Sequence, residues 1–146
     1  QAFQTLKDTL CKKPVLVFPD HRRAFVLRTD ASDRGMGAVL LQDHGDGLQP
    51  VAYASKKFND AQHNYATVEK ECLATVWGIQ KFERFLYGKS FTLETDHQPL
   101  QYLQRMKPTN ARLMRWAMQL QPYTFTIKVI PGESNFGADY LSRSTS

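Results

Sequence analysis

The chain has 146 residues, a length that suits one compact domain rather than two. Hydrophobic residues make up 42% of it and charged residues 23%, so extensive disorder is not expected. No apolar stretch approaches the roughly 18 residues of a membrane span, and no membrane partner is expected. The two cysteines are too few for a disulfide-dense scaffold or a four-cysteine zinc site. Because the chain begins at Gln1 without a basic-then-apolar leader, we expect a piece of a longer polypeptide, and the low cysteine content favours a reducing, intracellular setting.

The charge of the chain is unevenly distributed. The net charge is +5, from 19 Lys and Arg against 14 Asp and Glu, and the isoelectric point is about 9.3. No Asp or Glu occurs from His97 to Lys128, although Lys and Arg residues recur there. Such a segment is either a solvated basic face or a surface that contacts a polyanion such as nucleic acid. The charge pattern alone leaves both interpretations open.

The first part of the chain predicts a helix followed by three strands. Residues 1–12 have apolar side chains at helical spacing. Alternating stretches at 24–29, 35–41 and 49–55 predict strands, and the Asp- and Gly-rich residues 43–47 predict a hairpin turn between the last two. We therefore expect a three-stranded antiparallel meander.

The second part alternates helices and strands. Apolar residues at helical spacing predict one long helix over 64–87, with Cys72 in the core. The further predicted elements are a strand at 91–95, helices at 99–104 and 110–121, a strand at 123–130 and a short helix at 137–143. The helix before the fourth strand predicts a parallel crossover. The order βββαβααβα predicts a mixed α/β fold, a five-stranded sheet of three antiparallel and then two parallel strands with helices packed on it.

Four acidic residues stand out by their positions. Asp30 lies at the C-terminal end of the first predicted strand and Asp96 at the end of the fourth, so both emerge at one edge if these strands are neighbours. Glu71 lies on the long helix beside its apolar stripe, and Asp139 opens the last helix. Each has a plainer interpretation, as a turn or cap residue for the aspartates and as a solvated helix acid for Glu71.

Carboxylates that converge in one site require a counter-charge, because they cannot all ionise side by side. Oxygen ligands favour Mg²⁺ or Mn²⁺ over zinc. The histidines lack the spacing of a zinc site and are expected at the surface or behind the ligands: His21, His44, His63 and His97. Two such ions about 4 Å apart can activate a water and stabilise the leaving oxygen of a phosphodiester. This is nuclease chemistry, and it agrees with the basic segment.

These acids belong to longer stretches that together resemble one known family, the ribonuclease H domain of reverse transcriptases from gypsy-type long-terminal-repeat retrotransposons. The matching stretches are Thr29-Asp30-Ala31-Ser32, Gly35-Met36-Gly37-Ala38-Val39-Leu40, Tyr53-Ala54-Ser55-Lys56-Lys57, Asn64-Tyr65, Glu69-Lys70-Glu71-Cys72-Leu73-Ala74, Thr95-Asp96-His97-Gln98-Pro99-Leu100, Ile130-Pro131-Gly132 with Asn135, Ala138-Asp139 and Leu141-Ser142-Arg143. They cover nearly all of residues 24–143, in the family's order. By this resemblance, residues 21–146 form the ribonuclease H domain, and residues 1–20 look like the tail of the connection segment that follows the polymerase.

The resemblance implies endonucleolytic hydrolysis of the RNA strand of RNA–DNA hybrids by two Mg²⁺ ions, for which Mn²⁺ can substitute. Asp30, Glu71, Asp96 and Asp139 then match the family's four catalytic, metal-binding carboxylates. Glu69 is a rival for Glu71, but residues two apart on a helix differ by about 200° in direction, so only one can face the site. We prefer Glu71, because Glu-Cys-Leu-Ala aligns with the family's helix, whereas Glu69 in the first turn favours the helix dipole.

Contacts to the hybrid are expected to follow its shape, sugar hydroxyls and phosphates rather than its base edges. The backbone from Ser32 to Gly35 follows the first acid and is expected to meet 2′-hydroxyls. Arg112 and Arg115 match a basic cluster of the family and are expected to contact phosphates, whereas the helical stripe around Trp116 favours core packing. The implied partners are the hybrid and the polymerase domain of the parent polyprotein, in a cytoplasmic retroelement particle.

The sequence departs from the family pattern in one place, and two alternatives stay open. The loop at 131–137 lacks the His that cellular ribonucleases H often carry before the last acid, so turnover is slow or another group such as His97 serves. The main alternative is a catalytically idle module of the same fold in a domesticated, nuclear host protein, although the four acids favour the enzyme. A polynucleotidyl transferase of the integrase kind shares the fold but would place a Glu on a helix as its last acid.

Overall fold

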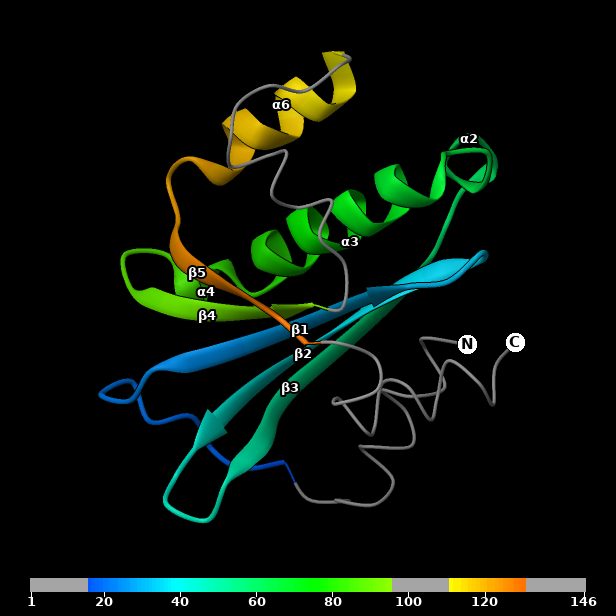
Figure 1. Cartoon of the computed structure of the whole chain (residues 1–146). Coiled ribbons are helices and arrows are strands. Elements are labelled where there is room, and N and C mark those ends of the chain that lie inside the picture. The colour runs from blue at the N-terminus through cyan, green and yellow to red at the C-terminus, as the bar shows by residue number, and fades with distance from the viewer. Residues whose placement is uncertain (1–15, 96–110, 131–146) are drawn as a thin grey trace.

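The computed structural model describes residues 16–95 and 111–130, which form a mixed sheet with helices packed on it (Figure 1). The strands are β1 (Phe25–Ala31), β2 (Gly35–Asp43), β3 (Leu48–Lys57), β4 (Ser90–Thr95) and β5 (Thr124–Val129), in the spatial order β3-β2-β1-β4-β5. The helices are α2 (Asp60–His63), α3 (Thr67–Lys81), α4 (Glu83–Leu86) and α6 (Ala111–Leu120). The predicted five-stranded mixed α/β fold is confirmed. The predicted helices at 1–12, 99–104 and 137–143 lie outside the described residues.

The strand directions also agree with the prediction. β1 pairs with β2 and β2 with β3 in antiparallel register, whereas β4 is parallel to β1 and β5 is parallel to β4. At the β2–β3 hairpin, Asp43 Oδ1 accepts hydrogen bonds from the N–H groups of Gly45 and Gly47, at 2.7 and 3.2 Å. Both glycines have positive φ angles, 118° and 95°, which other residues rarely adopt, so the turn depends on glycine at these positions.

The long helix predicted over residues 64–87 is divided in the structure. α3 begins after Ala66, whose backbone is extended, and ends at Phe82, where φ is −106° and ψ is 27°. Upstream, α2 is a separate short helix, capped by Asn59, whose side chain accepts the Gln62 N–H at 2.8 Å. Phe82 is buried in the core, so tertiary packing prevails over the local helical pattern at the break.

α3 lies between the sheet and α6 (Figure 1). Leu27 of β1, Leu40 of β2 and Ile79 of α3 are fully buried at the interface with the sheet. Cys72 is buried in the same core, as expected, and desolvation raises the pKa of its thiol from 9.0 to about 12. The thiol is therefore neutral and unreactive in the folded chain. Among the described residues, no helix is both long enough and apolar enough to span a membrane.

Gly78 allows α3 to approach β1 and β2 closely. A Cβ atom at this position would lie 2.9 Å from Thr29 Cγ2 and 3.1 Å from Ala38 Cβ, which is closer than ordinary packing permits. Thr29 cannot simply rotate away, because it is β-branched and its Oγ1 lies 3.2 Å from Thr75 Oγ1 in a buried hydrogen bond. The contact between helix and sheet therefore depends on the absence of a side chain at Gly78.

We predict that Gly78→Ala lowers the free energy of unfolding by about 1 to 3 kcal/mol, the usual effect of overpacking a core. Helix propensity acts in the opposite direction, since alanine is favoured over glycine within a helix by about 1 kcal/mol. Urea unfolding measures the balance, with Lys81→Ala on the exposed surface of the same helix as the control. A gain in stability for Gly78→Ala would show that the sheet yields at this contact.

Candidate active site

The direction of α3 determines which of its residues reach the end of β1. Thr75 contacts Thr29 through the two hydroxyls, whereas Gly78, almost one turn later, faces both Thr29 and Leu27. α3 therefore runs antiparallel to β1, and the residues before Thr75 lie toward the C-terminal end of the strand. A contact of Lys70 supports this direction. Its Nζ donates a hydrogen bond to the carbonyl of Asp33, just beyond the C-terminal end of β1, at 3.0 Å.

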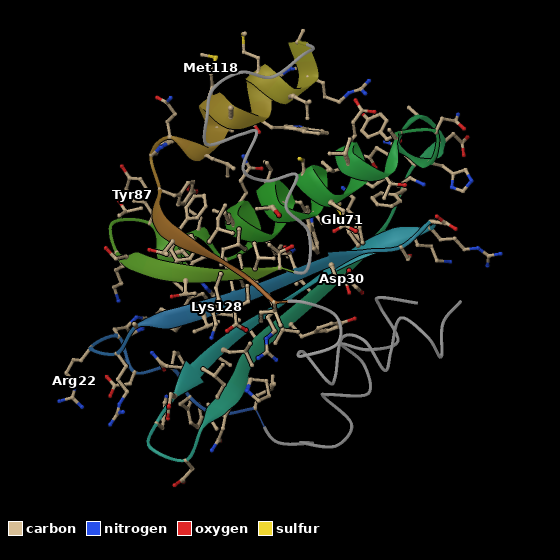
Figure 2. The ribbon with its side chains drawn as sticks, in the orientation of Figure 1. Arg22, Asp30, Glu71, Tyr87, Met118 and Lys128 are labelled. Atoms are coloured by element: carbon tan, nitrogen blue, oxygen red, sulfur yellow. The ribbon has the colours of Figure 1, made fainter. Side chains whose placement is uncertain are left out.

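Glu71 and Asp30 both lie toward this end of β1 (Figure 2). Glu71 precedes Thr75 by one turn, and the Thr75 hydroxyl donates to the Glu71 backbone carbonyl at 3.2 Å. Asp30 is the second-last residue of β1, is half-buried, and accepts the Ala31 N–H on its Oδ1 at 2.9 Å. The structure thus brings two of the four predicted acids to one region, one from α3 and one from β1.

Glu71 is buried, with only 5% of its surface exposed. The plainer interpretation of this residue as a solvated helix acid is therefore wrong. A buried carboxylate needs hydrogen bonds, a cationic partner or a bound metal to remain ionised. Because carboxylate oxygens are the ligands that Mg²⁺ and Mn²⁺ favour, Asp30 and Glu71 fit the donor set of such a site.

The rival acid, Glu69, is engaged on another side of α3. Its Oε1 accepts the Ala66 N–H at 3.0 Å, which caps the first turn of the helix. Its Oε2 pairs with Arg112 Nη1 of α6 at 2.7 Å. Both carboxylate oxygens thus have partners that belong to the helix start and to α6. This geometry favours Glu71 over Glu69 as the acid of α3 that serves the candidate site.

The C-terminal end of β4 lies at the same edge of the sheet, because β4 is parallel to β1. β4 ends at Thr95, which is buried and whose carbonyl accepts the Ile130 N–H at 2.8 Å. Asp96 and Asp139, the two other predicted ligands, lie outside the described residues. Within the part of the chain that the structure describes, no three His, Cys, Asp or Glu side chains gather into a metal-binding group, so the four-acid site stays a prediction.

The turn between β1 and β2 is held by its own polar groups. The Oγ of Ser32 accepts the N–H groups of Arg34 and Gly35, each at 3.2 Å, and the Ser32 N–H donates to the Gly35 carbonyl at 2.8 Å. The Ser32 hydroxyl is therefore used inside the turn, and the contact of this turn with 2′-hydroxyls stays a prediction. Arg34 is exposed at the tip of this turn and is a further candidate for contact with nucleic acid that the sequence analysis did not include. The feature that could have indicated it is a basic residue in a tight turn soon after Asp30.

α6 carries the predicted basic and aromatic residues. Trp116 is buried, and its ring centroid lies 6.1 Å from that of Tyr65, so its expected core packing is confirmed. The Arg112 guanidinium lies 3.9 Å from the Tyr65 ring centroid and pairs with Glu69, so it is held against α3. Arg115 is exposed. Phosphate contact stays a prediction for both arginines, and Arg115 is the more accessible of the two.

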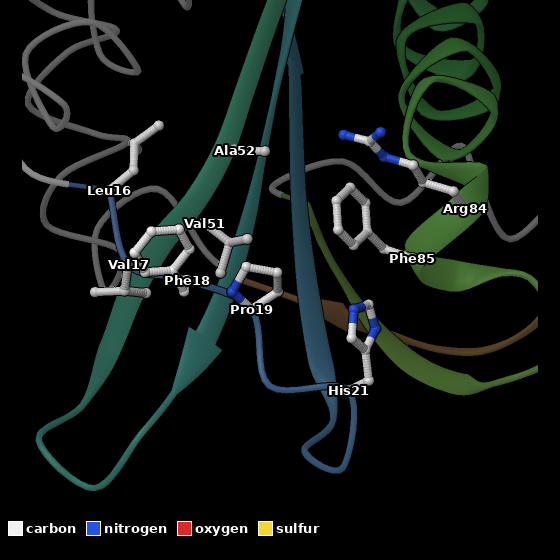
Figure 3. Close-up of a pocket in the computed structure, with 9 residues that line it drawn as sticks. All are labelled: Leu16, Val17, Phe18, Pro19, His21, Val51, Ala52, Arg84 and Phe85. Atoms are coloured by element: carbon white, nitrogen blue, oxygen red, sulfur yellow. The ribbon is translucent and has the colours of Figure 1, made fainter.

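A pocket of about 580 Å³ lies near the opposite end of β1 (Figure 3). Its walls include Phe18, Val51 and Phe85, and no Asp or Glu lines it. His21, also in the wall, stacks on Phe85 and lies edge-on to Phe25 at the start of β1, with ring centroids 6.2 and 6.4 Å apart. The pocket is therefore separate from the sheet edge toward which Asp30 and Glu71 lie, and it has no carboxylate that could bind a metal ion.

Comparison with known proteins identifies a family. The family described as "RNase H-like domain found in reverse transcriptase" matches residues 20–123 of the chain. The retrovirus-related Pol polyproteins from transposons 297 and gypsy of Drosophila melanogaster are 42% and 40% identical to the chain over 98% and 97% of its length. The Tf2-3 polyprotein of Schizosaccharomyces pombe is 39% identical over 98% of the chain. The chain spans only 13%, 14% and 11% of these three relatives.

Solved structures of a viral reverse transcriptase and of an RNase H1 share the fold. The foamy viral protease-reverse transcriptase in complex with an RNA/DNA hybrid matches with a TM-score of 0.62 and 20% identity, over 79% of this chain and 16% of that one. LC11-RNase H1, isolated from compost, matches with a TM-score of 0.58 and 15% identity, over 85% of this chain and 99% of that one. At such identities the likeness shows the ribonuclease H fold alone.

We predict that Arg112→Gln lowers the free energy of unfolding by about 1 kcal/mol, because it removes a partly exposed ion pair and a cation–π contact. Arg115→Gln removes the same charge from an exposed position on the same helix and should change stability by less than about 0.5 kcal/mol. Urea unfolding at low and at high salt measures both variants. Equal effects of the two substitutions would contradict the role of the Glu69–Arg112–Tyr65 contact between α3 and α6.

Proposed function

This chain belongs to the family of RNase H-like domains found in reverse transcriptases, and from this membership we propose that it hydrolyses the RNA strand of RNA–DNA hybrids. Its curated relatives are Pol polyproteins, which supports a place beside a polymerase domain in a retroelement polyprotein. We also propose that this polyprotein acts inside a cytoplasmic retroelement particle. One observation carries the proposal: the buried Glu71 of α3 and Asp30 of β1 lie toward the sheet edge at which β4 also ends.

The proposed chemistry belongs to that edge. Asp30 and Glu71, together with Asp96 and Asp139, would hold two Mg²⁺ ions, for which Mn²⁺ can substitute. Ions bound there supply an activated water for attack on the phosphodiester and a positive charge that stabilises the leaving oxygen. The contribution of the chain is to fix its carboxylates. Burial of Glu71 on a packed helix supports this role, because a site on a rigid element holds its geometry better than one on a loop.

Binding of the hybrid in this proposal depends on exposed cations of α6 and of the turn after β1. Arg115 lies on the outer surface of α6, and Arg34 lies at the tip of the turn that follows Asp30. A duplex held through its phosphates and sugar hydroxyls is recognised by shape, so we expect little preference for base sequence. The proposed enzyme is therefore a general hybrid-directed nuclease rather than a sequence-specific one.

Cleavage of a labelled RNA–DNA hybrid by the full chain in Mg²⁺ is the direct test of the function. Glu71→Gln and Asp30→Asn should each reduce the rate by more than about 100-fold, because loss of even an outer partner of a metal ligand costs about 10- to 100-fold. Glu69→Gln is the matched control, the same change two residues away. It should retain cleavage, with a loss of about 1 kcal/mol in stability, because Gln can still accept the Ala66 N–H but lacks the charge that pairs with Arg112.

A chelator should abolish cleavage by the wild-type chain. Hybrid binding without cleavage in either Mg²⁺ or Mn²⁺ would contradict the proposed function and favour a catalytically idle module of the same fold. Equal losses of activity in Glu69→Gln and Glu71→Gln would instead contradict the choice of Glu71 as the acid on α3. The two results separate the activity from the assignment of the residue.

Arg115→Gln should weaken hybrid binding evenly across base sequences and reduce the slope of log K against log salt by about one unit, the effect of losing one phosphate contact. Arg22→Gln is the control, because Arg22 is an exposed cation near the opposite end of β1, where it pairs with Asp20 (Figure 2). Fluorescence anisotropy of a labelled hybrid in EDTA, over a salt series, measures both slopes. An unchanged slope for Arg115→Gln would remove it from the binding surface.

A further inference from the structure

Lys70 is a buried cation that the proposed function leaves without a role. Only 9% of its surface is exposed, and its Nζ lies 5.5 Å from the Phe58 ring centroid and 3.0 Å from the Asp33 carbonyl oxygen, to which it donates a hydrogen bond. Among the residues 16–95 and 111–130, no ion pair joins Lys70 to a carboxylate. A buried ammonium is less favourable than an apolar side chain of similar size, so stability alone does not account for a lysine here.

The segment that Lys70 contacts is the turn directly after Asp30. Lys70 of α3 holds the carbonyl of Asp33, and the next carbonyl, that of Arg34, accepts the N–H of Phe58 at 2.9 Å. Phe58 directly follows β3, so donors from α3 and from the segment after β3 fix two successive carbonyls. Together with the hydrogen bonds inside the turn, these contacts hold the backbone immediately beyond the first predicted acid.

Lys70 is also the neighbour of Glu71 in the chain. One turn of α3 therefore carries two side chains that concern the site. Glu71 is a proposed metal ligand, and Lys70 holds the turn that follows the other proposed ligand, Asp30. A displacement of α3 along β1 would move Glu71 and strain the bond from Lys70 to Asp33 at the same time. Such coupling matters for the reaction, because a misplacement of about 1 Å in a catalytic group can cost about 100-fold in rate.

We propose that Lys70 is a positioning residue, which ties the β1–β2 turn to α3 and thereby sets the spacing between Asp30 and Glu71. The proposal rests on the function proposed for those two acids. It requires the ammonium donor itself and not only the aliphatic part of the side chain, because the donor is the group that reaches the Asp33 carbonyl.

Two substitutions at Lys70 separate the donor from the packing. Lys70→Met keeps most of the side-chain volume without the donor, and Lys70→Arg supplies a cationic donor again. Lys81→Met, an exposed lysine at the end of the same helix, is the matched control. The full chain is assayed for kcat and KM on a labelled hybrid, for urea unfolding, and for hydrogen exchange of the Arg34 and Gly35 amides.

We expect Lys70→Met to lower kcat by about 10- to 100-fold while KM for the hybrid stays within about twofold, since the loss concerns the geometry of the site and not binding. The Arg34 and Gly35 amides should exchange faster in this variant, and its stability should not fall. Lys70→Arg should recover most of kcat, and Lys81→Met should behave like the wild-type chain in every measurement.

A kcat for Lys70→Met within about twofold of the wild-type value overturns the proposal, because such a difference is too small for a misplaced ligand. An equal fall of kcat in Lys70→Met and Lys70→Arg together with lost stability also overturns it, since packing would then explain both. If the wild-type chain does not cleave hybrid, the proposed function fails first. The attachment of the turn to α3 is then decided by exchange alone: faster exchange in Lys70→Met supports it, and unchanged exchange overturns it.

Discussion

The contact of α3 with β1 is the constraint on which the rest of the structure depends. Because Gly78 has no side chain, the helix approaches the sheet closely enough for the hydroxyls of Thr75 and Thr29 to form a hydrogen bond in the core. This contact determines both the distance of α3 from the strand and its position along it. Glu71, one turn from Thr75, consequently lies toward the C-terminal end of β1. Core packing, rather than any interaction between the two acids, places Glu71 there.

The fold could largely be predicted from the sequence, because its signals are local. Alternating side chains mark the strands, Gly45 and Gly47 mark the hairpin, and the helix before β4 implies its parallel direction. The division of the long helix at Phe82 could not be predicted, since the apolar pattern continues through the break. Only the place of the Phe82 ring in the core, which depends on residues distant in the chain, distinguishes one helix from two.

The candidate site was less predictable, because three adjacent charged residues of α3 serve different neighbours. Glu69 caps the helix and holds Arg112, Lys70 holds the turn after β1, and Glu71 is buried. Adjacent side chains on a helix diverge by about 100°, so their partners come from different elements. The family motif favoured Glu71, but no local pattern reveals that a residue 43 positions away already binds Glu69. The role of Lys70 likewise depends on a tertiary contact with no periodic signature.

The central claim is that Asp30 and Glu71 share one divalent-ion site toward the end of β1. Mn²⁺ broadens the NMR signals of nearby nuclei, so a titration of the isotopically labelled chain locates the bound ion without any need for turnover. The account predicts that broadening at low Mn²⁺ centres on the amides of residues 30–35 and 69–72 and spares residues 20–23, near the start of β1. Broadening centred elsewhere, or its absence from either of the first two segments, would contradict the account.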